Sequence, residues 1–122
     1  MDGERIRLVV VDDAEASAQA LAGLLRNSGH EVWAVSDGAD ALRVIEQRKP
    51  HCVLFEVVMP GLSGDALGQQ LRDRYGDDIV LIALSACDAT DARVQHSFSL
   101  ADHYFTKPVD PAALAKLLRP FG

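Results

Sequence analysis

Short apolar runs alternate with amphipathic stretches along the chain. Five runs read as strands because they are short, rich in β-branched residues and bounded by polar residues or glycine. They cover residues 6–11, 31–35, 52–55, 79–84 and 104–106. Helical spacing marks residues 14–28, 39–48, 65–75 and 88–99, and a last helix after Asp110. This alternation predicts an α/β fold with a parallel sheet, helices on both faces and right-handed crossovers.

Residues at the helix ends support these boundaries. Gly29 follows the first helical stretch, where a C-terminal cap glycine is favoured, and Asp110-Pro111 supplies an N-cap and a first-turn proline. Apolar side chains are expected on one face of the first and the last helix. The first stripe, with one serine, is Leu21, Leu24, Leu25 and Ser28, and the last is Leu114, Leu117, Leu118 and Phe121.

The third strand ends in an unusual way. Residues 53–64 read Val-Leu-Phe-Glu-Val-Val-Met-Pro-Gly-Leu-Ser-Gly, so the apolar run stops at Glu56 and a Met-Pro-Gly turn follows. A carboxylate at the mouth of a buried strand costs free energy unless a neighbour uses its charge. Glu56 is therefore the first candidate for a functional residue.

Polar residues also follow the other strands. Asp12 and Asp13 end the first strand, Ser85 follows the fourth, and Lys107 follows the fifth. Parallel strands place all their carboxyl ends along one edge, and open α/β sheets bind ligands there. We therefore expect these side chains to meet Glu56 at a single site.

Such a cluster suits phosphoryl chemistry with a hard cation. Carboxylate oxygens without nearby His or Cys favour Mg²⁺, and a lysine beside a small hydroxyl suits a phosphoryl group. The alternative is that these residues are merely solvated strand ends. Solvated strand ends are a weaker explanation for all of these residues together. Asp12, Asp13 and Glu56 repel one another unless Lys107 or a metal offsets their charge.

Composition narrows the class further. The 122 residues, 48% of them hydrophobic, predict a single domain spanning residues 1–122. The net charge of −6 argues against direct nucleic-acid binding. No run is long enough to span a membrane and no leader opens the chain, so a soluble cytoplasmic protein is expected. Cys52 is expected to be a small core residue.

Four segments, taken together in this order, resemble the receiver domain of two-component response regulators. They are Val11-Asp12-Asp13, Met59-Pro60-Gly61 with Gly64, Leu84-Ser85-Ala86, and Tyr104-Phe105-Thr106-Lys107-Pro108. The resemblance covers essentially the full chain. It implies a flavodoxin-like fold with five parallel strands in the order 2-1-3-4-5 and five helices.

The resemblance also implies roles by position. Asp12, Asp13 and the backbone carbonyl of Val58 would hold Mg²⁺. Ser85 and Lys107 would contact the phosphoryl group, and Ser85 and Tyr104 would act as the switch. The implied partners are a histidine kinase or phosphotransfer protein, and an output domain or partner at the face formed by helix four, strand five and helix five.

Two positions depart from the family. Glu56 stands where the family carries its phospho-accepting aspartate, four residues before Pro60. Its extra methylene moves the carboxylate deeper, so we expect phosphorylation to be lost or impaired, with partial phosphomimicry at most and Mg²⁺ binding weakened or displaced. Leu100 stands where the family usually has glycine, and a leucine does not readily adopt a left-handed cap.

The leading hypothesis is a non-enzymatic receiver module of a phosphorelay. A small Mg²⁺-dependent phosphohydrolase using the same acidic edge is the alternative, although so short a chain has no substrate-recognition insert. Flavin binding is a third reading, supported only by analogy of fold.

Overall fold

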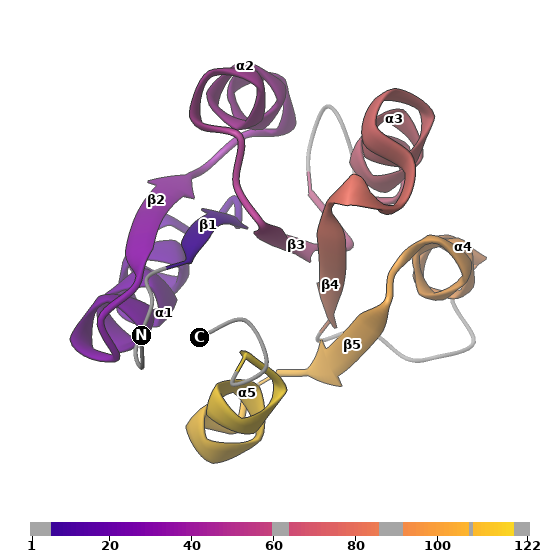
Figure 1. Ribbon diagram of the computed structural model, residues 1–122. Helices are drawn as coiled ribbons and strands as arrows, with labels where there is room; N and C mark the ends of the chain where they lie inside the picture. Colours follow the sequence, from indigo (N-terminus) through magenta and orange to yellow (C-terminus); the bar gives the residue numbers. More distant parts are fainter. Residues whose placement is uncertain (1–5, 60–63, 86–91, 108, 119–122) are drawn as a thin grey trace.

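The computed structural model describes residues 6–59, 64–85, 92–107 and 109–118. Within these ranges, five strands form one parallel sheet in the order β2-β1-β3-β4-β5, which confirms the expected strand order (Figure 1). The strands are β1 (Arg7–Val11), β2 (Glu31–Val35), β3 (Cys52–Glu56), β4 (Val80–Ser85) and β5 (His103–Thr106).

Helices cover both faces of this sheet, as Figure 1 shows. They are α1 (Glu15–Asn27), α2 (Gly38–Arg48), α3 (Gly64–Tyr75), α4 (Ala92–Leu100) and α5 (Pro111–Leu118), with a 3-10 turn η1 (Gly76–Asp78) after α3. Helices α1 and α5 pack on one face, and α2 and α3 pack on the other. Helix α4 lies against α3 and β4. No helix in the described ranges is long and apolar enough to cross a membrane.

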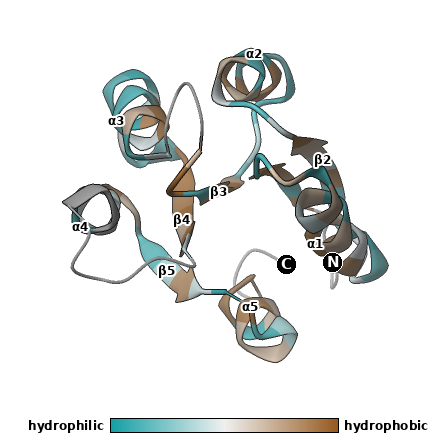
Figure 2. Cartoon of the chain, turned by 180° about the vertical axis from the view of Figure 1, so that it is seen from behind, coloured by the Kyte–Doolittle hydropathy of each residue, from teal (hydrophilic) through white to brown (hydrophobic). Residues whose placement is uncertain are grey.

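The strands alternate their side chains between two buried cores because successive residues of a strand point to opposite faces. Val9 and Phe55 face α2 and α3, whereas Val10 and Leu54 face α1 and α5. All five residues of β3 are buried, as is expected for the centre of a sheet covered on both faces. Cys52 is buried as expected. In Figure 2 the apolar colouring gathers on the strands and on the helix sides that face them.

The expected apolar stripe of the first helix is confirmed at Leu25, which is buried, and at Leu21, which packs against the core, but is wrong at Leu24. The buried residues of α1 are Ala18, Ala22 and Leu25, whereas Leu24 is 46% exposed. The spacing of three and four residues places these side chains on one face. Two alanines, Ala18 and Ala22, therefore belong to the buried face, and the bulkier Leu24 lies outside it.

The strand ends extend slightly beyond the predicted runs. Glu56 and Ser85 are the last residues of β3 and β4, because Glu56 pairs with Leu84 and Ser85 pairs with Thr106 in the ladder. Gly29 has a φ of 95° after α1, and Asp110 accepts a hydrogen bond from the Ala112 amide at 3.0 Å, so both predicted caps are confirmed. Residues 88–91 and Phe121, placed in helices by the sequence pattern, lie outside the described residues.

Candidate functional site

The carboxyl edge of the sheet brings three of the predicted side chains into contact. Asp12 directly follows β1, Glu56 ends β3, and Lys107 directly follows β5. The Lys107 ammonium lies 2.5 Å from Asp12 Oδ2 and 2.7 Å from Glu56 Oε2. One cation therefore bridges two carboxylates from different strands.

Hydrogen bonds with the backbone hold both the amide and the side chain of Asp12 in place. Its amide donates to the Val35 carbonyl at 3.0 Å, and its Oδ1 accepts from the Ala14 amide at 2.9 Å. The Asp12 side chain is 4% exposed. Only its second oxygen, Oδ2, faces the Lys107 ammonium.

Glu56 is placed by backbone hydrogen bonds of Val57 and Gly64. The Val57 amide donates to the Leu84 carbonyl at 2.9 Å, and the Gly64 amide donates to the Val57 carbonyl at 2.8 Å. A Cβ on Gly64 would lie 2.1 Å from the Glu56 carbonyl oxygen, so only glycine allows α3 to begin this close to β3. The close approach of α3 to β3 therefore explains why glycine stands at position 64 of the predicted motif.

Burial and the charge of the partner shift the pKa values of Glu56 and Lys107 in opposite directions. Burial raises the pKa of the Glu56 carboxyl; the Lys107 ammonium opposes this, and the charges of Asp12 and Asp13 add to the rise, so the net direction is upward. Burial lowers the pKa of Lys107, but hydrogen bonds to Asp12 and Glu56 outweigh it and the net pKa is raised. The lysine is thus held in its charged form by the two carboxylates.

The remaining predicted site residues differ in burial. Ser85 is 1% exposed, and its carbonyl accepts from the Lys107 amide at 2.9 Å, which ties β4 to the residue after β5. Asp13 is exposed, and Val58 is partly buried in the turn after β3. Tyr104 is 50% exposed on β5. The roles of these four residues stay predictions.

The described acidic residues at this edge are not grouped as a metal site of three side chains. In the described part of the chain, no three His, Cys, Asp or Glu side chains are grouped so that they could hold a metal ion. The two buried carboxylates instead share an ammonium. Asp12, Asp13 and the Val58 carbonyl remain predicted metal ligands.

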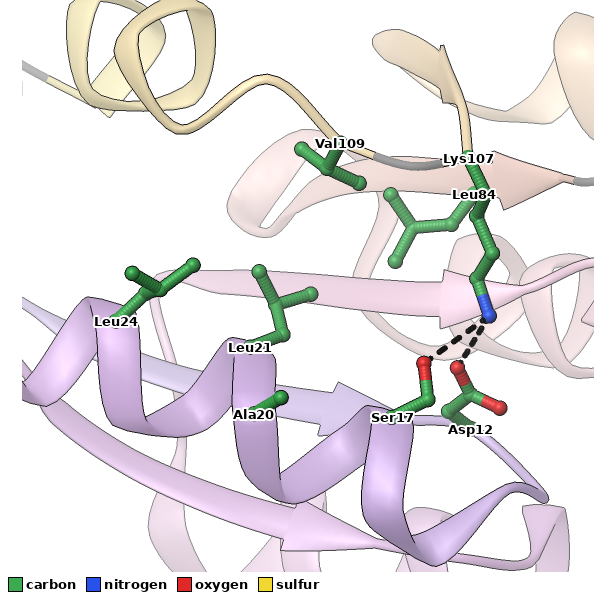
Figure 3. Close-up of a pocket in the computed structure, with 8 residues that line it drawn as sticks. All are labelled: Asp12, Ser17, Ala20, Leu21, Leu24, Leu84, Lys107 and Val109. Atoms are coloured by element: carbon green, nitrogen blue, oxygen red, sulfur yellow. Dashed lines mark hydrogen bonds and ion pairs between the residues drawn. The ribbon is translucent and has the colours of Figure 1, made fainter.

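The sequence pattern did not single out Ser17. Its hydroxyl lies 3.4 Å from the Lys107 ammonium and belongs to the first turns of α1 (Figure 3). Ser17 stands five residues after Asp12, so its place near the start of the first predicted helix was the available signal. It gives the ammonium a third oxygen partner.

An open groove begins at this bridge and runs along α1 (Figure 3). It has a volume of about 400 Å³ and is mostly apolar beyond Asp12, Ser17 and Lys107. Its apolar lining is Ala20, Leu21, Leu24, Leu84 and Val109. The half-exposed Leu24 belongs to this groove.

The sequence also did not reveal a clasp formed by Arg72 and Asp102. The Arg72 guanidinium binds Asp102 Oδ2 at 2.7 Å and donates from Nε to the Leu100 carbonyl at 2.7 Å. Leu100, at the end of α4, does not have a positive φ, as expected for a leucine at this position. Arg72 thus caps α4 from the side.

Comparisons with known proteins agree with this geometry. Residues 8–119 match the family model of the response regulator receiver domain. Protein PilH of Pseudomonas aeruginosa is 34% identical over 113 residues, covering 92% of this chain and 93% of PilH. Response regulator MprA of Mycobacterium sp. strain KMS is 37% identical, covering 93% of this chain and 47% of MprA, so the chain spans about half of that relative.

A solved structure is similar over the whole chain. The response regulator receiver domain (CheY-like) from Methylobacillus flagellatus has a TM-score of 0.85 and 28% identity, covering 98% of this chain and 100% of that one. Fold, family model and relatives agree. The chain belongs to the response regulator receiver domain family.

Proposed function

We propose that this receiver domain works as a signalling module whose phosphoryl-acceptor chemistry is disabled by Glu56. The observation that carries the proposal is the position of the Glu56 carboxylate, 2.7 Å from the Lys107 ammonium at the end of β3. The family places its acceptor aspartate there. In this chain the longer side chain already reaches the lysine assigned to the incoming phosphoryl group.

The extra methylene matters because phosphoryl transfer depends on in-line positioning of the nucleophile. A misplacement of about 1 Å costs roughly a hundredfold in rate. Glu56 is 6% exposed, and Gly64 packs against its backbone, so the strand end has little freedom to retreat. Attack by Glu56 on a phosphodonor is therefore strongly disfavoured.

Glu56 also brings a carboxylate to the pocket, paired with the Lys107 ammonium. A carboxylate has one charge and two oxygens, whereas an acyl phosphate brings up to two charges and three terminal oxygens. Reversing a two-state equilibrium takes about 5.5 kcal/mol, and one charged hydrogen bond contributes about 1.5–3 kcal/mol. Partial mimicry of the phosphorylated state follows.

The proposed partners are a histidine kinase or phosphotransfer protein and an output partner. The output partner would bind the face formed by α4, β5 and α5. Tyr104 is half exposed on β5, and Ser85 is buried at the end of β4 beside Thr106. This arrangement supports the assignment of Ser85 and Tyr104 as the pair that would report the state of the pocket to that face.

Intact-mass analysis after incubation with a small-molecule phosphodonor tests the proposal. The wild-type chain should show no adduct of about 80 Da, the mass of one phosphoryl group, and Glu56→Asp should show one. Glu46→Asp, the same change at an exposed position on α2, should behave like the wild type. Efficient labelling of the wild type would contradict the disabled acceptor.

The phosphohydrolase alternative has a separate test. A generic phosphomonoester assay with and without Mg²⁺ should give no turnover above the buffer. Mg²⁺-dependent turnover that is lost in Asp12→Asn would favour the enzyme reading instead.

A further inference from the structure

We infer that the Lys107 ammonium takes the place of a divalent cation in this pocket, so that the described residues of the pocket leave no site for Mg²⁺. The resemblance to receiver domains implies Mg²⁺ held by Asp12, Asp13 and the Val58 carbonyl, and the described residues of this chain depart from that arrangement. The inference rests on the proposed function because it concerns the same pocket.

The ammonium has three N–H donors, and three side-chain oxygens surround it. Asp12 Oδ2 lies at 2.5 Å, Glu56 Oε2 at 2.7 Å and Ser17 Oγ at 3.4 Å. Asp12 and Ser17 accept hydrogen bonds from the ammonium, and Glu56 forms an ion pair with it. The positive charge sits between the two buried carboxylates, where it offsets their mutual repulsion.

The oxygens left for a metal are few. Asp12 Oδ1 already accepts from the Ala14 amide at 2.9 Å. Asp13 is exposed, and it does not complete a group of three metal-ligating side chains within the described residues. Mg²⁺ takes a nearly octahedral set of oxygens, several of them waters, and is held by one or two carboxylates. A dication at this place would have to displace the ammonium from both carboxylates.

The length of Glu56 explains why this chain differs. An aspartate at the end of β3 is one methylene shorter, so its carboxylate would withdraw from the ammonium. Glu56 spans that gap while its backbone stays in the β3–β4 ladder. Glu56→Asp should therefore release Lys107 from one partner and return an oxygen to the acidic edge.

Isothermal titration calorimetry with Mg²⁺ and Mn²⁺, in the absence of any phosphodonor, tests the inference. The wild-type chain should give no saturable heat at millimolar metal. Lys107→Met keeps an unbranched apolar chain but removes the charge, so it should bind either metal at least about tenfold more tightly. Lys116→Met, the same change at an exposed position on α5, should behave like the wild type.

Thermal unfolding supplies a second readout. Ligands that bind only the folded state raise Tm, so Mg²⁺ should raise the Tm of Lys107→Met and leave the wild type unchanged. If Lys107→Met does not fold, Glu56→Asp takes its place with the same expectation. Saturable one-to-one binding by the wild type would overturn the inference, and so would failure of every folded variant to bind metal.

These outcomes separate the inference from the proposed function. Phosphodonor labelling of the wild type in the presence of a chelator would refute the disabled acceptor and leave the cation assignment intact. Metal binding by a wild-type chain that is not labelled would refute the cation assignment and leave the disabled acceptor intact.

Discussion

Gly64 lies so close to Glu56 that a Cβ on the glycine would be 2.1 Å from the Glu56 carbonyl oxygen. The start of α3 therefore rests directly on the end of β3. Because Glu56 is the residue whose carboxylate meets Lys107, this backbone contact helps to fix the position of the pocket's central charge.

Replacing Gly64 by alanine should destabilise the fold. The added Cβ would also meet Val57 Cα at 2.6 Å, so backbone has to move, and overpacking of this kind costs about 1–3 kcal/mol or more. Gly23→Ala in α1 is the control, because nothing lies within 4 Å of its Cβ position. It should gain up to about 1 kcal/mol from helix propensity. Urea unfolding measures both, and equal effects would contradict this account.

The two sides of the ion bridge should differ in their contribution to stability. Lys107→Met leaves Asp12 and Glu56 buried without their cation, and breaking a buried pair this way costs about 3 kcal/mol. Glu56→Gln should cost less than half of that, since Lys107 keeps Asp12. Urea unfolding at neutral pH checks the order, and a larger loss in Glu56→Gln would show that the ammonium is not the shared partner.

Asp102 should make stability depend on pH at the acidic end. Burial raises the pKa of its carboxyl, but the Leu81 amide and the Arg72 guanidinium outweigh this and the net pKa is lowered. Its charge therefore stabilises the fold above the unfolded value of about 3.9, and the effect is lost as pH falls through the lower folded pKa.

Comparing the wild type with Asp102→Asn tests this sign. The wild type should have the larger free energy of unfolding at pH 7, and the difference should shrink toward about pH 3. Asp77→Asn, at an exposed position in η1, should show no such trend. A difference that grows on acidification would contradict the lowered pKa.

Ser97→Ala should stabilise the protein. Ser97 is fully buried on α4, and its hydroxyl has no hydrogen-bond partner among the described residues. A buried hydroxyl without a partner costs about 1–3 kcal/mol, so removing it should raise the free energy of unfolding by about 1 kcal/mol.

Ser99→Ala is the matched control for Ser97→Ala. Ser99 lies on the same helix but is exposed, and its hydroxyl donates to the His96 carbonyl at 2.6 Å. Its change should stay within about 0.5 kcal/mol. If both variants gain equally in urea unfolding, helix propensity and not the buried hydroxyl is responsible.

The sequence by itself determined the layers, the strand order through its family resemblance, and the edge where Asp12, Glu56, Ser85 and Lys107 end their strands. These features follow from local patterns, because hydrophobic period and turn residues set the strands, and parallel strands must end along one edge. The predicted departure at Glu56 rests on its position in the same motif.

Only the tertiary structure decided which groups touch. Lys107 and Asp12 are 95 residues apart, and their pairing depends on side-chain reach across the two intervening strands, β3 and β4. The Arg72–Asp102 clasp and the burial of α1 on Ala18 and Ala22 likewise depend on how closely helices approach the sheet. Such contacts are long-range and set by packing, so spacing along the chain does not reveal them.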